Sequence, residues 1–282
     1  MHVCTNKTKY YRMWFQTEID ALEFFERGNA ITRCDSEYYL QQYSHKFKWP
    51  AKARVLEVGS GDGSVTKILS KYIPEDSELI GSDISEKAVQ FANRKYANEQ
   101  IKFILFDVAG DVPDDMKESF DHVFSFYVFH WENNHEKAFT NIYNILSKDG
   151  EFFSIFVARM DIYTVFEILS RKNKWKQWMK NMDTFLSPYY DFKDPDIHLS
   201  NRLKSIGFEV LDVKCTQKYF VHDNINDYRD LITAVNAFDI PHHMWSELLD
   251  EFIEVKRYMN LVDEKGAVKS HYNLMILHCI KK

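Results

Sequence analysis

The chain has 282 residues, which is enough for one large domain with a substantial hydrophobic core. Apolar residues make up 45% and charged residues 28%, as in an ordinary soluble globular protein. The net charge of -6, without a dense run of Lys and Arg, argues against a nucleic-acid partner. No run approaches the roughly 18 apolar residues that a membrane span needs.

The N-terminal residues lack the apolar segment of a secretory signal. Residues 1–18 are expected to form a frayed extension, and residues 19–282 a single domain. Helices are predicted between residues 17 and 47, with a break near Gly28 and an end before Pro50. The four cysteines form no CxxC pair, which indicates reduced thiols in a cytoplasmic protein and no metal site.

From residue 53 short apolar runs alternate with amphipathic segments, a pattern typical of a parallel sheet with crossover helices. Strands are predicted at 54–58, 78–81, 101–106, 122–126 and 151–157. Helices are predicted between them at 64–72, 86–97 and 136–146, the last followed by Gly150. Right-handed crossovers then place helices on both faces of the sheet.

The C-terminal part is less regular. Helices are predicted at 163–182, 199–206, 227–235 and 245–259, and strands at 208–219 and 271–280. The fold class is therefore α/β, a Rossmann-like sheet that is mostly parallel with an antiparallel last strand. Helical segments at about 160–190 and 225–260 interrupt the sheet and are expected to form a lid over the carboxyl ends of the strands, where such sheets bind ligands.

Three glycines follow the first predicted strand and immediately precede a helix. In this strand–turn–helix context Gly59, Gly61 and Gly63 let the backbone turn sharply and approach a ligand closely. Their spacing differs from the dinucleotide fingerprint, and Glu57 and Asp62 would repel a pyrophosphate. Two carboxylates suit a cationic ligand instead, such as S-adenosylmethionine, which carries an ammonium and a sulfonium.

Acidic residues also end the second and third predicted strands. Asp83 is expected to accept from the ribose hydroxyls, with Ile84 over one face of the adenine. Asp107 is expected to accept from the adenine amino group, while Val108 donates its backbone N–H. Any one of these acids alone reads as a solvated loop carboxylate. Acids at three successive strand ends, behind a glycine turn, indicate a cofactor site.

The sequence EVGSGDG, with Asp83 and Asp107, resembles class I S-adenosylmethionine-dependent methyltransferases over about residues 50–160. The resemblance implies S-adenosylmethionine as cofactor. The expected cofactor-binding residues lie on the first four strands and the turns after them: Glu57, Gly59, Ser60, Gly61, Asp62, Gly63, Asp83, Ile84, Asp107, Val108, Ser125 and Phe126.

A longer resemblance concerns the fourth strand and its exit, Phe120–Trp131 (FDHVFSFYVFHW). Together with Gly81–Ser85 and Asn141–Leu146, it is similar to the insect juvenile hormone acid methyltransferases, over about residues 19–282. Shorter matches are Lys174–Trp175, Ser187–Tyr189, Ile206–Phe208 and Phe252–Val255. These enzymes methylate the carboxylate of juvenile hormone acid or farnesoic acid, so the resemblance implies a hydrophobic small-molecule acid as substrate.

An acid substrate needs no general base, because a carboxyl group of pKa ~4 is an anion at neutral pH. Trp131 is expected to donate its indole N–H to that anion; the alternative is a core tryptophan, and the family resemblance favours the functional role. His130 is either a base for another acceptor or a packed loop histidine. Aromatic side chains are expected to shape the substrate pocket, among them Tyr127, Phe156, Trp175 and Trp178.

One position departs from the family pattern. Thr32 stands where the resemblance places a Gln that supports the carboxylates of both cofactor and acceptor, and Gln16 supplies that amide only if the register slips. Losing one charge-assisted hydrogen bond costs roughly 1.5–3 kcal/mol, or about tenfold to a hundredfold in rate. The departure indicates a different acid substrate or weak activity on the hormone acid, and places Thr32 beside Trp131 and His130 among the candidate catalytic residues.

Three hypotheses stay open at this point. The first is a carboxyl O-methyltransferase for an isoprenoid acid. The second is a methyltransferase for another small or fatty acid, or for a hydroxyl with His130 as base. The third is a cofactor-binding paralogue that carries the acid with little turnover. A homodimer is compatible with each of them.

Overall fold

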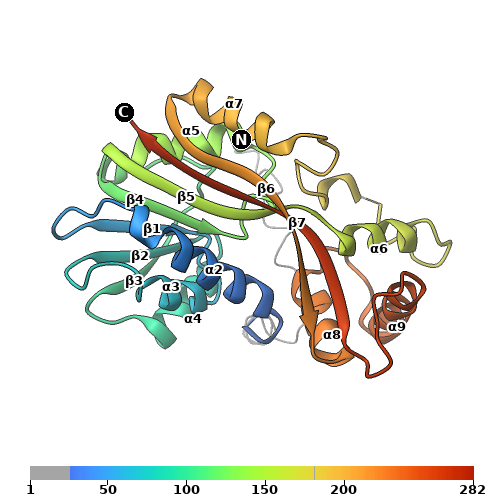
Figure 1. Cartoon of the computed structure of the whole chain (residues 1–282). Coiled ribbons are helices and arrows are strands. Elements are labelled where there is room, and N and C mark those ends of the chain that lie inside the picture. The colour runs from blue at the N-terminus through green and yellow to red at the C-terminus, as the bar shows by residue number, and fades with distance from the viewer. Residues whose placement is uncertain (1–25, 181) are drawn as a thin grey trace, which may run out of the picture. The chain divides into compact units, whose positions relative to one another are not determined.

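The computed structural model describes residues 26–180 and 182–282, and it contains a seven-stranded sheet in the order β3-β2-β1-β4-β5-β7-β6 (Figure 1). The expected N-terminal extension at 1–18, and Gln16 within it, lie outside the described residues. The strands are β1 (Arg54–Val58), β2 (Glu78–Asp83), β3 (Ile101–Leu105), β4 (Phe120–Phe126), β5 (Leu146–Met160), β6 (Phe208–His222) and β7 (Val268–Lys281).

Neighbouring strands from β3 to β5 run parallel, and β7 is antiparallel to β5. Beyond β7, the strand β6 runs in the opposite direction to it (Figure 1). This confirms the predicted Rossmann-like sheet. The strand order changes direction at the β1–β4 pair, and sheets of this kind bind ligands beyond the carboxyl ends of the strands at such a point.

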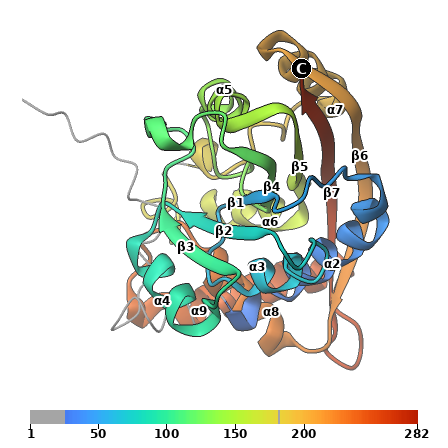
Figure 2. The same ribbon diagram turned by 90° about the vertical axis from the view of Figure 1, so that its left-hand side faces the viewer.

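Helices cover both faces of the sheet (Figures 1 and 2). Helices α5 (His135–Ile145) and α7 (Pro195–Ile206) lie on one face. On the other face lie α2 (Ala30–Tyr43), α3 (Ser64–Leu69) and α4 (Glu86–Tyr96), and short 3-10 turns are η2 (Ser44–Lys46) and η3 (Asp114–Met116).

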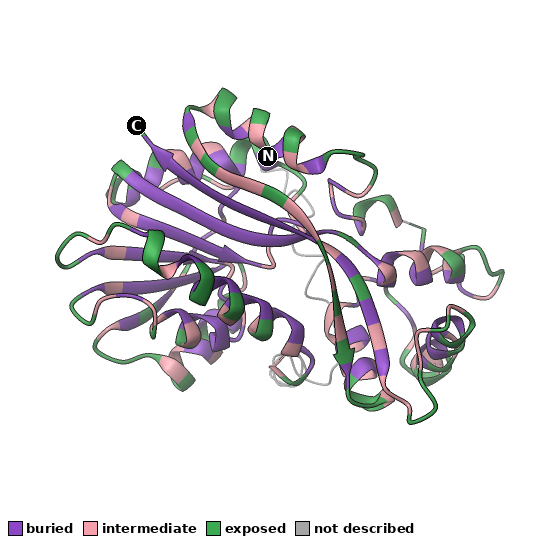
Figure 3. Ribbon diagram, in the orientation of Figure 1, coloured by how far each residue is buried: buried purple, intermediate pink, exposed green. Residues whose placement is uncertain are grey.

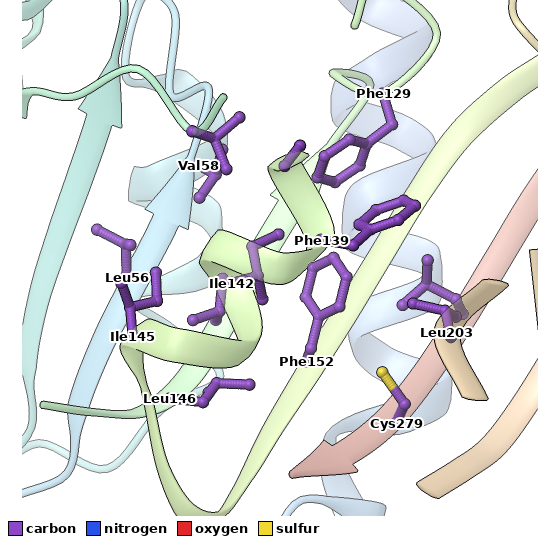
Figure 4. Close-up of a cluster of buried hydrophobic side chains, with 14 of the residues drawn as sticks. Leu56, Val58, Phe129, Phe139, Ile142, Ile145, Leu146, Phe152, Leu203 and Cys279 are labelled. Atoms are coloured by element: carbon purple, nitrogen blue, oxygen red, sulfur yellow. The ribbon is translucent and has the colours of Figure 1, made fainter. Parts of the chain in front are cut away.

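Alternating side chains of the strands supply the two cores. In β4, Val123 belongs to the core beneath α5, while the ring of Phe124 faces Phe47 at 5.2 Å on the α2 side. Figure 4 shows Phe139 and Phe152 packed together in the first of these cores. Strands β5 and β7 are buried over most of their length, whereas exposed and partly buried residues follow one another along the edge strand β6 (Figure 3).

The described residues divide into two compact units. The first, here called the sheet unit, consists of residues 30–160, 186–218 and 271–282. The second, the helical unit, consists of residues 26–29, 161–180, 182–185 and 219–270. It contains α6 (Asp161–Ser170), η4 (Met182–Thr184), α8 (Ile225–Val235) and α9 (His242–Tyr258). Its core is aromatic, with Phe166 within 5.2 Å of the rings of Phe185, Phe238 and Phe252.

The helix predicted over 163–182 is wrong beyond Ser170. The N–H groups of Lys172, Trp175 and Trp178 each bond to a carbonyl three residues back, so successive tight turns replace the helix there. These turns bury Trp175 completely. Helix α5 ends at Ile145, one residue before the predicted end at Leu146, because Leu146 already pairs with Phe120 in the sheet. No helix within residues 26–180 and 182–282 has the length and apolar character to cross a membrane.

Candidate functional site

The three glycines form the turn between β1 and α3, and each has a positive φ: 75° at Gly59, 53° at Gly61 and 82° at Gly63. L side chains rarely adopt this conformation. A Cβ on Gly59 would lie 2.2 Å from Val128, and one on Gly63 2.9 Å from Ala92. The turn therefore accepts only glycine at both positions, and its backbone is closely packed on the protein side.

Glu57, the penultimate residue of β1, is 1% exposed. Its Oε2 has no hydrogen-bond partner among the described residues. Burial raises the pKa of Glu57 to about 8, and the nearby carboxylates of Asp62 and Asp83 add to the effect. A buried carboxyl group with an unused oxygen is neutralised either by a proton or by a cation, and the ammonium of S-adenosylmethionine is such a cation. The residues present therefore fit the expected cofactor.

The carboxylate of Asp62 caps the start of α3. Its Oδ1 accepts from the backbone N–H of Ser64 at 3.0 Å and from the Ser64 hydroxyl at 2.8 Å. The neighbouring hydroxyl of Ser60 is buried and has no partner within the described ranges. Asp62 thus fixes the shape of the turn. The unpaired hydroxyl of Ser60 is available to a ligand bound at the turn.

Asp83 ties the end of β2 to the glycine turn. Its Oδ2 accepts from the backbone N–H of Gly61 at 2.9 Å, and its Oδ1 accepts from Ser85 at 2.9 Å. Burial raises the pKa of Asp83, although these backbone hydrogen bonds oppose the rise. The next residue, Ile84, is a large apolar side chain left 45% exposed. This pair suits a nucleoside, because the carboxylate can accept from the ribose hydroxyls while the exposed apolar side chain covers the base.

Asn141, for which the sequence predicted no role, holds the loop after β3. Asn141 of α5 donates to the carbonyls of Val108 and Gly110, each at 2.8 Å. Asp107 accepts from the backbone N–H of Ala109 at 2.9 Å, which fixes its side chain within the loop. Asn141 lies in the predicted helix 136–146, but nothing in that pattern tells a buried amide from a surface one.

Ser125 and Phe126 end β4 inside the protein. The Ser125 hydroxyl donates to the carbonyl of Val58 at 3.0 Å, and Phe126 is 3% exposed beside Phe153. Ser125 thus ties β4 to β1. The assignment of these two residues to the cofactor site stays a prediction.

At the exit of β4 the residues predicted to face the acceptor lie together. The Tyr127 hydroxyl donates to Asp35 Oδ2 at 2.6 Å. His130 is 7% exposed, and its ring lies 5.9 Å from that of Tyr127 and 4.9 Å from that of Trp131. Burial lowers the pKa of His130 to about 3, so this imidazole is neutral at pH 7. Trp131 is half-buried.

The remaining predicted acceptor residues do not share one unit. Thr32, 8% exposed on α2, and Phe156, fully buried on β5, belong to the sheet unit. Trp175 and Trp178 belong to the helical unit. Phe156 packs against Phe129 with ring centres 5.8 Å apart, so it is also a core residue. Within the described ranges, no group of three or more His, Cys, Asp or Glu side chains is arranged to hold a metal ion.

Comparison with known sequences gives consistent matches. A methyltransferase domain family model matches residues 56–154. The chain is 33% identical to the juvenile hormone acid O-methyltransferase of Bombyx mori, covering 92% of this chain and 96% of the relative. It is 29% identical to the enzyme of the same name from Drosophila melanogaster, covering 91% of each.

Solved structures show the same fold. The phosphoethanolamine N-methyltransferase 2 of Haemonchus contortus, in complex with S-adenosyl-L-methionine, superposes with a TM-score of 0.56 at 15% identity, covering 98% of this chain and 58% of that one. The YcgJ protein of Bacillus subtilis superposes with a TM-score of 0.57 at 14% identity, covering 87% of this chain and 98% of that one.

Proposed function

Because this chain belongs to the juvenile hormone acid O-methyltransferase family and is an S-adenosylmethionine-dependent methyltransferase, we propose that it methylates the carboxylate of a hydrophobic isoprenoid acid. Juvenile hormone acid and farnesoic acid are the two candidate substrates, and the product is the methyl ester. The relatives that carry this name match nearly the whole chain.

The observation that favours an acid over an alcohol as the methyl acceptor is that the histidine and tyrosine side chains after β4 are neutral and weakly basic. Burial lowers the pKa of His130 to about 3 and that of His135 to about 4. Burial also raises the pKa of Tyr127 well above its ordinary value, so its phenol keeps its proton. These groups are poor acceptors for an alcohol proton at pH 7. A carboxylate acceptor has no proton to lose.

The bound cofactor supplies an electrophilic methyl group on a sulfonium. A carboxylate oxygen forms the new bond to the methyl carbon as the carbon–sulfur bond breaks, and the electron pair stays on sulfur. The protein's task is then alignment. We assign the indole N–H of Trp131 to one carboxylate oxygen and the hydroxyl of Thr32 to the other, with Tyr127 and His130 forming the wall beside them.

On the cofactor side, we assign Glu57 to the ammonium, Asp83 to the ribose hydroxyls and Asp107 to the adenine amino group. Ile84 covers the adenine. The turn from Gly59 to Gly63, with the backbone of Val108, Ser125 and Phe126, completes the proposed site. The unpartnered, buried oxygen of Glu57 supports this orientation, because it puts an uncompensated carboxyl group where the cofactor is cationic.

The apolar tail of the acid needs an apolar enclosure. We assign that role, within the sheet unit, to Phe156. The substrate contacts expected of Trp175 and Trp178, and the lid expected at about 160–190 and 225–260, stay predictions. At ~25 cal/mol per Å² of apolar surface, burial of a long tail supplies most of the binding free energy. The proposal includes a cytoplasmic location, and light scattering would test the predicted homodimer.

Transfer of a radiolabelled methyl group tests the proposal. The purified protein is incubated with labelled S-adenosylmethionine and, in parallel, farnesoic acid, juvenile hormone acid, a fatty acid of similar length and farnesol. We expect labelled ester from one or both isoprenoid acids and none from farnesol. With saturating cofactor, the rate should be flat from pH 6 to 9, because the acceptor is already ionised. Product from farnesol alone would contradict the proposal.

A second candidate is a paralogue that binds the acid with little turnover. The observation that favours it is Thr32, buried on α2, where the family pattern has a Gln. Calorimetry separates the two functions. Heat from farnesoic acid binding in the presence of S-adenosylhomocysteine, with no labelled ester, would identify the carrier.

A further inference from the structure

The carboxylate of Asp35, on α2, is a fully used buried acceptor. The residue is 4% exposed. Its Oδ2 accepts from the hydroxyls of Tyr127 at 2.6 Å and Tyr272 at 2.8 Å, and its Oδ1 accepts from Lys218 Nζ at 2.5 Å. The three donors come from the exit of β4, from β7 and from β6, and all four residues belong to the sheet unit. One helix side chain therefore joins three parts of the sheet.

The charge of this cluster is balanced internally. The ammonium of Lys218 is 20% exposed and also lies over the rings of Tyr38 and Tyr39, 4.8 and 4.7 Å from their centres. A buried carboxylate that is paired and hydrogen-bonded on both oxygens has one strongly preferred arrangement. Asp35 therefore holds the hydroxyl of Tyr127 at a fixed point.

The backbone of Tyr127 is held as firmly as its side chain. Its φ is 61°, in the left-handed region that a residue with a bulky side chain rarely adopts. Its N–H donates to the carbonyl of Ile155 on β5 at 2.8 Å. A residue with an unfavourable backbone angle keeps it only when its surroundings impose it, and here α2 and β5 do so from either end.

The next residue carries this constraint to the glycine turn. Val128 packs so closely on Gly59 that a Cβ at Gly59 would lie 2.2 Å from Val128 Cγ2. Gly59 in turn donates its N–H to the carbonyl of Ser82 at 2.7 Å. A shift of Tyr127 therefore moves Val128 against, or away from, the turn proposed to hold the methyl donor.

We propose that Asp35 is a positioning residue for the methyl donor, acting on the glycine turn through Tyr127 and Val128. Because both of its oxygens already accept from protein donors, we assign it no contact with either substrate. The inference rests on the proposed placement of the donor at this turn and does not depend on which acid is methylated.

A matched pair of variants tests the inference. Tyr127→Phe and Tyr272→Phe each remove one hydroxyl from the same oxygen of Asp35, but only Tyr127 adjoins Val128, and β5 separates β7 from β4 in the sheet. Both variants should lose thermal stability to a similar degree. Binding of S-adenosylhomocysteine, measured by calorimetry, should weaken roughly tenfold in Tyr127→Phe and less than about twofold in Tyr272→Phe.

Val128→Ala leaves Asp35 untouched and provides a second route, should Tyr127→Phe fail to fold. It should also weaken binding of S-adenosylhomocysteine. Combined with Asp35→Asn, it should weaken binding less than the product of the two single effects, because both act along one path. Equal weakening by the two tyrosine variants, or full additivity, would overturn the positioning role. Wild-type protein that binds no S-adenosylhomocysteine would instead overturn the proposed donor site.

Discussion

Glu151 and His278 face each other between β5 and β7, with 2.5 Å between the carboxylate Oε2 and the imidazole Nε2. Both residues are at most 3% exposed. Burial alone would raise the pKa of Glu151, but the hydrogen bonds from His278 and from the backbone N–H of Lys48 bring it below its ordinary value. The pair lies at the amino end of the parallel strands, because Glu151 pairs with His122 near the start of β4.

Replacing Glu151 with Gln should lower the free energy of unfolding by about 2–4 kcal/mol, because His278 then loses a buried anionic partner. The rate at saturating substrate should stay close to wild type, since the candidate active site lies at the carboxyl ends of the strands and Glu151 lies near their amino ends. Urea unfolding and the methyl-transfer assay measure the two effects. Glu78→Gln, which removes two partly exposed ion pairs, with Lys102 and with Arg54, is the control and should shift the midpoint far less.

Buried neutral histidines predict a loss of stability in mild acid. Burial lowers the pKa of His122, His135 and His222 to about 4 and that of His130 to about 3. Between pH 6.5 and 4 the unfolded chain therefore binds protons that the folded chain does not, and stability falls as the pH falls. Each such histidine contributes about 1.4 kcal/mol per pH unit.

Glu57 and Asp83, whose pKa values burial raises, act in the opposite direction but are fewer. Urea midpoints at pH 7, 6 and 5 measure the net effect. His122→Phe should flatten the dependence, because the ring stacks on Trp49 and neither nitrogen has a hydrogen-bond partner among the described residues. Midpoints that do not change from pH 7 to 5 would contradict the assignment.

The sheet and the glycine turn were predictable because their signals are local. The apolar strands recur with helices between them, and the positive φ at Gly59, Gly61 and Gly63 leaves a direct trace in the sequence. The run at 163–182 misled because Trp175, Trp178 and Met179 keep the apolar spacing of a helix beyond Ser170, although Ser170 and Asn173 favour turns.

The Asp35 cluster left no such trace. Its partners Tyr127, Lys218 and Tyr272 are 92, 183 and 237 positions away along the chain, and each alone resembles a surface residue of its element. Aromatic residues were ambiguous for a related reason. An apolar ring such as Phe156 suits a packed core as well as a substrate pocket, and only tertiary contacts tell the two apart.

Glu57 predicts that binding of the methyl donor depends on pH. With a pKa of about 8 the free protein holds a proton on this carboxyl at pH 7, and an ammonium ligand would displace it. Affinity for S-adenosylhomocysteine should therefore rise with pH from 6 to 8, by up to about tenfold per unit, and level off above. Calorimetry in buffers of different ionisation enthalpy measures the proton released.

The variant Glu57→Gln separates the effect of this carboxyl group on donor binding from its effect on the stability of the free protein. Its donor affinity should drop, roughly tenfold to a hundredfold at pH 8, and lose its pH dependence. Its stability without ligand at pH 8 should rise, because an uncompensated buried charge is gone. Weaker binding that still varied with pH as in the wild type would point to another titrating group.

Thr32→Gln should increase kcat/KM for the isoprenoid acid about tenfold, since a Gln amide reaches further and carries two N–H donors, whereas the Thr hydroxyl carries one. Thr32 lies one turn before Asp35 on α2, so the helix that carries it is already fixed to the sheet unit. Thr32→Val is the control, because it keeps the shape and removes only the hydroxyl. Rates on farnesoic acid, measured beside the melting temperatures, separate a chemical gain from a packing loss at this 8% exposed position. A stable Gln variant with unchanged or lower kcat/KM would show that the acceptor carboxylate is held elsewhere.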